Sequence, residues 1–225
     1  MIPPEQNAAF VAAMEDVLDL YAEPYDEPFP VVCLDERPCF LIADVLTPIP
    51  LGPGRPQRYD YEYTKNGSAN VFGFLEPKTG QRHLRVTERR TKQDFAHAIN
   101  YLLTELYPAA TKVRLVLDNL NTHTLAALYD TFPAEEARRL ARRLEFHFTP
   151  KHGSWLNAVE LEFAALSKQC LDRRIGSREE LTAEVSAWCR ERNLSGSPLD
   201  WRFDTLTARR KLKRIYPRLD ESNQC

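Results

Sequence analysis

The sequence predicts a mixed α/β fold in which a five-stranded sheet is flanked by helices. Apolar runs of strand length, such as residues 31–34 and 113–117, alternate with longer segments whose apolar residues recur every three or four positions. These segments follow the order three strands, helix, strand, helix, strand, helix, which is typical of a mixed α/β plan. With 225 residues, 43% of them hydrophobic, the chain is long enough to bury one substantial core.

The first expected elements are a helix and a strand. Residues 7–21 place five apolar side chains on one helical face: Phe10, Met14, Val17, Leu18 and Tyr21. Residues 22–30 contain three prolines and three acids and are expected to form a loop. The run VVCLDE at residues 31–36 is typical of a buried strand. Residues 40–45 either continue this strand or form its hairpin partner.

A flexible loop and a hairpin follow. Residues 47–58 contain four prolines and two glycines, so no core element is expected there. Residues 70–75 and 83–88 predict two short strands, and residues 76–80 join them with a Pro and a Gly that suit a hairpin loop. Together with the first strand they predict an antiparallel meander of three strands.

Helices and strands alternate in the next part. Helical spacing over residues 91–106, with Asp94 in the first turn, predicts a helix that packs on the sheet. Residues 113–119 predict a strand, residues 124–143 a helix that breaks at Pro133, and residues 144–150 a further buried strand.

The last part is expected to be helical. From Gly153 the spacing of apolar residues predicts a helix through LNAVELEFAALSKQCL, with Ser154 as its N-cap. A second helix is expected over residues 178–192, and a basic, partly helical arm over residues 205–218.

Charge is unevenly distributed, although the formal net charge is only −2. Residues 1–36 contain nine acidic and no basic residues, whereas residues 137–218 contain eighteen Lys and Arg against ten Asp and Glu. This asymmetry allows a basic face that contacts phosphates, and a solvated surface is the equally supported alternative.

The cysteines indicate a reducing compartment. Five are present, namely Cys33, Cys39, Cys170, Cys189 and Cys225. They include no C-x-x-C pair and mostly lie in apolar patterns, so we expect packed free thiols rather than a zinc or redox site. No apolar run approaches the length needed to span a bilayer, and no signal peptide is evident. We expect a protein that is soluble and not secreted.

Three acids lie where apolar elements end or begin. Asp35 follows VVCL, Asp118 follows VRLVL, and Glu160 is expected in the second turn of the helix that begins near Ser154. Strand ends are where α/β proteins place ligands. Converging acids raise one another's pKa unless a cation lies between them. A single such acid is more often a cap, a turn residue or a salt-bridge partner, so the three are informative only as a set.

Glu162 is an alternative to Glu160 as the third acid. The two residues flank the apolar stripe of Val159 and Phe163 on opposite sides, so helical spacing alone leaves both open. Glu160 lies nearer the start of the helix, where a site at the strand ends is more easily reached.

Five ordered blocks resemble the mariner-related insertion-sequence transposases, specifically the insertion sequence 630 group. The blocks are VVCLDE, YEYTKNGSANVFGFLEP, LVLDNLNTHT, FTPKHGSWLNAVELEF and WRFDTLTARRKLKRIYP, and the likeness covers residues 2–219. The resemblance implies a ribonuclease H-like core with an Asp, Asp, Glu triad. The matching positions are Asp35, Asp118 and Glu160, the last in the block N-x-x-E, which favours Glu160 over Glu162.

The resemblance also implies a chemistry and partners. It implies metal-dependent cleavage and strand transfer of DNA by in-line attack on phosphodiesters, without a covalent enzyme intermediate. Carboxylate oxygens suit Mg²⁺, or Mn²⁺ as a substitute, and two ions are expected. The implied partners are transposon ends and target DNA, with insertion at TA dinucleotides, in a homodimer or larger assembly without a membrane. The implied compartment is the prokaryotic cytosol.

Neighbouring residues are candidates for supporting roles. Polar residues near the acids are expected to line the site or to stabilise its loops: Asn119, Asn121, His123, His152, Ser154 and Asn157. Candidates for sequence-independent phosphate contact are Lys151, Arg173, Arg174, Arg209, Arg210, Lys211, Lys213 and Arg214. Core packing is favoured over base stacking for Trp155 and Trp201.

We expect an N-terminal helix with an acidic linker at residues 1–30, a catalytic domain at 31–195 and a basic arm at 196–225. Related transposases begin with paired helix-turn-helix modules that recognise the inverted repeats, and this chain starts just before the core. A truncation or one product of an interrupted reading frame is therefore expected, with weak recognition of transposon ends. The alternatives are a nuclease acting on RNA or hybrid duplexes, and a catalytically idle DNA-binding or dimerisation fragment.

Overall fold

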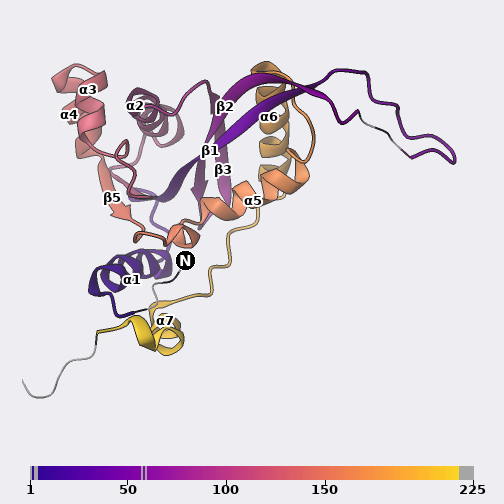
Figure 1. Cartoon of the computed structure of the whole chain (residues 1–225). Helices are drawn as coiled ribbons and strands as arrows, with labels where there is room; N and C mark the ends of the chain where they lie inside the picture. Colours follow the sequence, from indigo (N-terminus) through magenta and orange to yellow (C-terminus); the bar gives the residue numbers. More distant parts are fainter. Residues whose placement is uncertain (1, 3–4, 57, 59, 218–225) are drawn as a thin grey trace, which may run out of the picture.

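The computed structural model describes residues 2, 5–56, 58 and 60–217. Its centre is a five-stranded sheet of order β3-β2-β1-β4-β5 (Figure 1). The antiparallel meander consists of β1 (Val31–Asp44), β2 (Tyr63–Glu76) and β3 (Gln81–Thr87). β4 (Val113–Leu117) runs parallel to β1, and β5 (Leu144–Phe148) runs parallel to β4. The predicted mixed sheet of three antiparallel strands followed by two more is confirmed.

Helices cover both faces of the sheet. One face carries α2 (Lys92–Tyr101), the π-helical turn η1 (Leu102–Leu106), α3 (Ala126–Thr131) and α4 (Ala134–Arg142). The other carries α1 (Ala8–Ala22), α5 (Val159–Gln169) and α6 (Arg178–Leu194), and α7 (Thr205–Lys211) packs on α1. Two short 3-10 turns are η2 (Ser154–Leu156) and η3 (Lys213–Ile215). The predicted break at Pro133 is confirmed, because α3 ends and α4 begins around it.

The central strands are buried on both faces. On β1, Cys33 packs in the core under α5, whereas Val32 and Leu34 pack in the core under α2. On β4, Val116 packs under α5 and its neighbours Leu115 and Leu117 under α2. Because successive side chains of a strand point to opposite faces, two covered faces explain why these strands are contiguous apolar runs.

β1 and β2 are longer than their apolar patterns. Residues 40–45 continue β1 as far as Asp44, and β2 begins at Tyr63 rather than at the expected residue 70. The two strands project beyond the rest of the sheet as a two-stranded ribbon (Figure 1). Residues 63–68 are exposed, so the strand here is held by backbone pairing and has no apolar alternation for a sequence pattern to detect. Within the predicted loop 47–58, the described residues form two isolated bridges, Ile49 with Arg58 and Gly52 with Arg55.

The helix predicted from Gly153 begins later. α5 starts at Val159, after η2, and Ser154 makes no capping hydrogen bond with its side chain. The chain turns at Asn157, which has extended backbone angles (φ −80°, ψ 105°) and a buried side chain that donates from Nδ2 to the carbonyl oxygen of Leu34 at 2.8 Å. This tertiary contact interrupts the helix, so Glu160 lies in the first turn of α5 rather than in its second.

α5 lies close to the sheet at Gly73. A Cβ atom added to Gly73 would lie 2.7 Å from Cζ of Phe163 and 3.0 Å from Cγ2 of Val159. Gly73 is the register partner of Asp35 on β1. The absence of a side chain at this position therefore sets how closely the first turns of α5 approach Asp35.

The expected packing roles of the thiols and tryptophans fit the structure. Cys33, Cys39, Cys170 and Cys189 are free thiols and all but Cys39 are buried, whereas Cys225 lies outside the described residues. The ring of Trp155 lies edge-on to Phe203 and that of Trp201 edge-on to Tyr21. None of the helices formed by the described residues has the length and apolar character needed to cross a membrane.

Candidate active site

Two of the predicted acids occupy equivalent positions on adjacent parallel strands. Cys33 of β1 pairs with Val116 of β4, and two residues further along each chain lie Asp35 and Asp118. Cys33 and Val116 both face the core under α5, so alternation along β1 directs Asp35 to that same face. Asp118 lies one residue beyond the end of β4, close enough for its charge to act on Asp35 and Glu160. Glu160 comes from the first turn of α5, which packs on this face.

The three carboxyl groups influence one another electrostatically. Asp35 is only 8% exposed, and burial raises its pKa to about 7; the N–H of Glu36 opposes the rise, and the charges of Glu160 and Asp118 add to it. The pKa of Glu160 is also raised, first by burial and also by Asp118, against the opposing charge of Arg37. Asp118 therefore disfavours ionisation of both Asp35 and Glu160, and Glu160 disfavours ionisation of Asp35; a bound cation would relieve these effects.

The three acids interact electrostatically, but their side chains are not grouped as the ligands of a bound metal ion would be. Within residues 2, 5–56, 58 and 60–217, no three His, Cys, Asp or Glu side chains are grouped so that they could enclose a metal ion. The chemistry of the donor set nevertheless suits a hard divalent cation, because all three groups are carboxylates and one is buried with a raised pKa.

His123 lies behind Asp118 and is 1% exposed. Its Nδ1 lies 2.6 Å from Oδ1 of Asp118, and its Nε2 lies 2.9 Å from Oε1 of Glu36. Its ring also packs on Phe95, with the ring centroids 4.7 Å apart. Glu36 is adjacent to Asp35 on β1, so its side chain points to the opposite face of the sheet, which α2 covers. His123 therefore connects Glu36 on that face to Asp118 after β4.

Two asparagines hold the loops of the site. The side chain of Asn119 donates to the carbonyl oxygen of Thr149 at 3.0 Å, which joins the ends of β4 and β5. Asn157 joins the start of α5 to β1 just before Asp35. The hydroxyl of Tyr21 donates to the Leu156 carbonyl oxygen at 2.8 Å and accepts from the Ala158 N–H at 3.2 Å. α1 therefore fixes the turn that precedes Glu160.

His152 and Lys151 lie in the loop between β5 and α5, and both are exposed. His152 has φ 65°, and among the described non-glycine residues it is the one with a positive φ. Such a conformation is uncommon for a residue with a side chain and indicates that the loop geometry is imposed by its surroundings.

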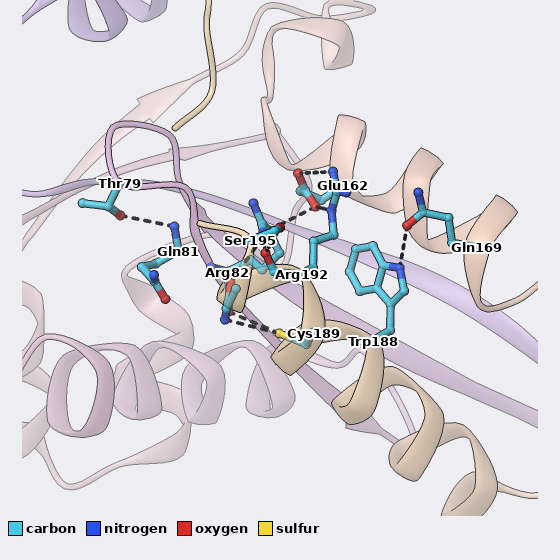
Figure 2. Close-up of polar contacts among 10 residues, drawn as sticks. Thr79, Gln81, Arg82, Glu162, Gln169, Trp188, Cys189, Arg192 and Ser195 are labelled. Carbon is cyan, nitrogen blue, oxygen red and sulfur yellow. Dashed lines mark hydrogen bonds and ion pairs between the residues drawn. The ribbon is translucent and has the colours of Figure 1, made fainter. Parts of the chain in front are cut away.

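Glu162 belongs to a separate buried ion cluster (Figure 2). Its carboxylate lies 2.7 Å from Nε of Arg192 and 3.1 Å from Nε of Arg82, the latter out of line for a hydrogen bond. Arg82 also donates to the Arg192 carbonyl oxygen at 2.8 Å. This cluster joins α5, β3 and α6, and it engages the carboxylate of Glu162 in ion pairs with two arginines.

The basic candidates divide into paired and exposed side chains. Arg173 forms an ion pair with Glu184, and Arg174 binds Asp44 at 2.7 Å and the carbonyl oxygens of Asp60 and Glu62. On α7, Arg209 binds Glu15 of α1 through both oxygens, at 2.8 and 2.9 Å. Part of the basic arm is thus neutralised by the acidic N-terminal helix. The remaining candidates are exposed: Lys151, Arg210, Lys211, Lys213 and Arg214.

Two charged residues beside the triad were not among the sequence candidates. Glu36 is buried against His123, and Arg37 lies two residues beyond Asp35 on β1. The available signal was the charged run Asp35-Glu36-Arg37 inside an apolar strand, where charged side chains are costly unless partnered.

The five-stranded sheet of order β3-β2-β1-β4-β5 with helices on both faces is a fold of the ribonuclease H-like class. The family model for the DDE superfamily endonucleases matches residues 30–182. The chain belongs to this family.

Solved structures of Mos1 transposase share the fold. The Mos1 strand transfer complex is 16% identical with a TM-score of 0.51, covering 84% of this chain and 56% of that one. The mariner Mos1 paired-end complex with Mg is 15% identical with a TM-score of 0.51, covering 85% and 58%. The Mos1 paired-end complex with the left transposon end is 15% identical with a TM-score of 0.50, covering 84% and 57%. The chain thus spans less than two thirds of these proteins. A comparison with curated proteins gave no match.

Proposed function

We propose that this chain is the catalytic part of a mariner-related DNA transposase that cuts and joins DNA strands by in-line attack on phosphodiesters. The observation that carries the proposal is the placement of Asp35 on β1 and of Asp118 directly after the parallel strand β4, with Glu160 in the first turn of α5. Membership of the DDE superfamily endonucleases supports it. The insertion sequence 630 group is the subgroup that the sequence blocks favour.

Asp35, Asp118 and Glu160 would hold two Mg²⁺ or Mn²⁺ ions. The raised pKa of buried Asp35 beside two further acids supports a site that needs a cation. When bound, two such ions supply the charge that activates the attacking oxygen and stabilises the leaving oxygen.

The other residues of the site would act by orientation. His123 holds one oxygen of Asp118 and leaves the second free for a ligand. Asn157 and Tyr21 fix the turn from which Glu160 projects. Water as attacker would cut a strand, whereas a 3′-hydroxyl of DNA as attacker would join it to a target, so one site would serve both steps.

The partners we propose are transposon ends and target DNA, in a homodimer or larger assembly. The Mos1 structures were solved as paired-end and strand transfer complexes, which supports DNA as the partner. Exposed apolar side chains on β1 and in the loop between β1 and β2 support protein contacts there: Phe40 of β1 is 78% and Leu51 of the loop 76% exposed. We propose residues 31–195 as the catalytic domain, residues 1–30 and 196–225 as its flanking segments, and the prokaryotic cytosol as the compartment.

A nicking assay tests the proposed function. Wild-type protein is expected to convert supercoiled plasmid to nicked circles in Mg²⁺ or Mn²⁺ and to lose this activity in EDTA. Asp118→Asn is expected to abolish nicking while the circular dichroism spectrum and melting temperature stay close to those of the wild type. Matched RNA and hybrid duplexes test substrate class. Wild-type nicking by the Asp118→Asn variant, or cleavage of RNA in preference to DNA, would overturn the proposal.

A further inference from the structure

Arg37 lies on the same face of β1 as Asp35. The two residues are two positions apart in one strand, so their side chains point to the face covered by α5. The register continues regularly through both positions, Asp35 opposite Gly73 and Arg37 opposite Val71. Arg37 therefore projects into the space between β1 and the first turn of α5, from which Glu160 comes.

The guanidinium of Arg37 has an unused donor at this place. Its Nε is buried and has no hydrogen-bond partner among the described residues. Arg82 also has a buried Nε without a hydrogen bond among the described residues, but that atom lies 3.1 Å from a carboxylate oxygen of Glu162. Leaving a buried charged donor unpaired is costly, so the unpartnered Nε of Arg37 indicates a missing acceptor.

The charges around Arg37 suggest the kind of acceptor that is missing. Glu160 and the thiol of Cys39 are close enough for the Arg37 charge to lower the pKa of each, against the larger effect of burial. These groups balance part of the positive charge but leave Nε without an acceptor. A guanidinium offers several N–H donors in a planar fork, which suits the oxygens of a phosphate better than a single carbonyl oxygen.

We propose that Arg37 binds the phosphodiester that is attacked, donating N–H groups to its non-bridging oxygens beside the three acids. The inference rests on the proposed function and names a phosphate-binding residue within the same site. Positive charge placed there would also offset the negative charge that develops on the phosphate oxygens during in-line attack. Arg37 is thus assigned to substrate binding rather than to holding the fold.

A binding cycle tests this contact directly. The cut position in a short duplex is first mapped with wild-type protein, and the phosphate at that position is then replaced by an uncharged methylphosphonate. Affinities are measured in Ca²⁺, under conditions that leave the duplex intact. Arg37→Gln is expected to weaken binding of the normal duplex about tenfold, the loss of one charged hydrogen-bonded pair. On the methylphosphonate duplex the same variant should bind as the wild type does.

The controls distinguish a local contact from a general effect. Arg190→Gln removes the same charge from an exposed position on α6. It should weaken binding only slightly, and equally for the two duplexes. Arg37→Lys keeps the charge but loses the fork, so it should recover only part of the affinity. Circular dichroism of each variant checks the fold.

The outcomes separate the two proposals. If the losses from Arg37→Gln and from the methylphosphonate multiply, Arg37 does not touch that phosphate, and the inference fails while the proposed function stands. The inference also fails if Arg37→Gln loses its fold and Arg37→Lys binds both duplexes with the same deficit. If wild-type protein nicks no DNA, the proposed function fails and the inference fails with it.

Discussion

Nδ1 of His123 lies 2.6 Å from Oδ1 of Asp118, and Nε2 of the same ring lies 2.9 Å from Glu36. Burial alone would lower the pKa of this imidazole, but hydrogen bonds to Asp118 and Glu36 outweigh burial and raise it to about 10. A charged imidazolium between two carboxylates therefore connects β1 to the loop after β4. Asp118 reaches the site in an orientation set by this contact.

His123→Gln is expected to destabilise the fold by about 2 to 4 kcal/mol, because it leaves Glu36 as a buried charge without its cationic partner. Since the folded-state pKa is raised, the stabilisation from His123 is complete below about pH 6.5 and is lost as the pH rises through 10. Urea unfolding at pH 6 and pH 9 measures both effects. Exposed His97 provides the control variant, His97→Gln, which should change stability little at either pH. An equal loss for the two variants would contradict the role of His123.

Glu160 and Glu162 form a natural matched pair, two residues apart on α5 with different partners. Glu160→Gln should abolish nicking and leave stability unchanged or slightly higher, because it removes a carboxylate whose pKa is raised by burial. Glu162→Gln should cost roughly 3 kcal/mol by leaving Arg82 and Arg192 without their buried counter-charge. Its nicking rate per folded molecule should stay near the wild-type value.

Thermal melting measures the stability of both variants, and a nicking assay measures their activity. The assay is run well below the melting temperature of the weaker variant, so that both proteins are folded. If Glu162→Gln lost nicking while folded and Glu160→Gln retained it, the third acid of the proposed triad would have to be reassigned.

The sequence predicts best those features that depend on burial alone. The segments VVCL of β1 and LVL of β4 are contiguous apolar runs because both sheet faces are covered there. Asp35 and Asp118 are conspicuous because they follow these runs. The exposed half of β2, residues 63–68, escaped prediction because it pairs through its backbone and buries no side chains.

Features that depend on tertiary contacts could not be read from the sequence. The start of α5 is set by the hydrogen bond from Asn157 to Leu34, which joins residues far apart in the chain. Helical spacing also left both Glu160 and Glu162 open as the third acid. The structure distinguishes them because Arg82 and Arg192 form ion pairs with Glu162. Arg37 needed the strand register to bring it onto the face of Asp35.

Gly73→Ala is expected to move the first turns of α5 away from β2. The new Cβ would lie 2.7 Å from Cζ of Phe163, and overpacking of this kind costs about 1 to 3 kcal/mol. Because Glu160 lies in the same turns, nicking should fall more than stability does. Phe163→Leu shortens the opposing side chain, so the double variant should be more active than Gly73→Ala alone. An unchanged nicking rate in Gly73→Ala would mean that this close approach does not set the position of Glu160.

Stability without metal should decrease as the pH rises through the range in which Asp35 ionises. Burial raises the pKa of Asp35 from 3.8 to about 7, so the folded protein holds this proton more tightly than the unfolded chain does. The contribution of Asp35 to stability is therefore largest below about pH 4 and falls as the pH rises to 7, by up to about 4 kcal/mol. Asp35→Asn carries no charge and should lack this decrease.

Divalent cations should reverse the loss of stability that follows ionisation of Asp35, if Asp35, Asp118 and Glu160 bind them. Urea unfolding is measured in EDTA and in about 10 mM Mg²⁺, each at pH 5 and at pH 8. Mg²⁺ should stabilise the wild type at pH 8, where Asp35 is ionised, and much less at pH 5, where the proton competes with the metal. Asp35→Asn should gain little at either pH, whereas the exposed-site variant Arg190→Gln should respond as the wild type does. Equal stabilisation of wild type and Asp35→Asn at pH 8 would place the cation elsewhere, since the metal would then bind without the carboxylate whose ionisation it relieves.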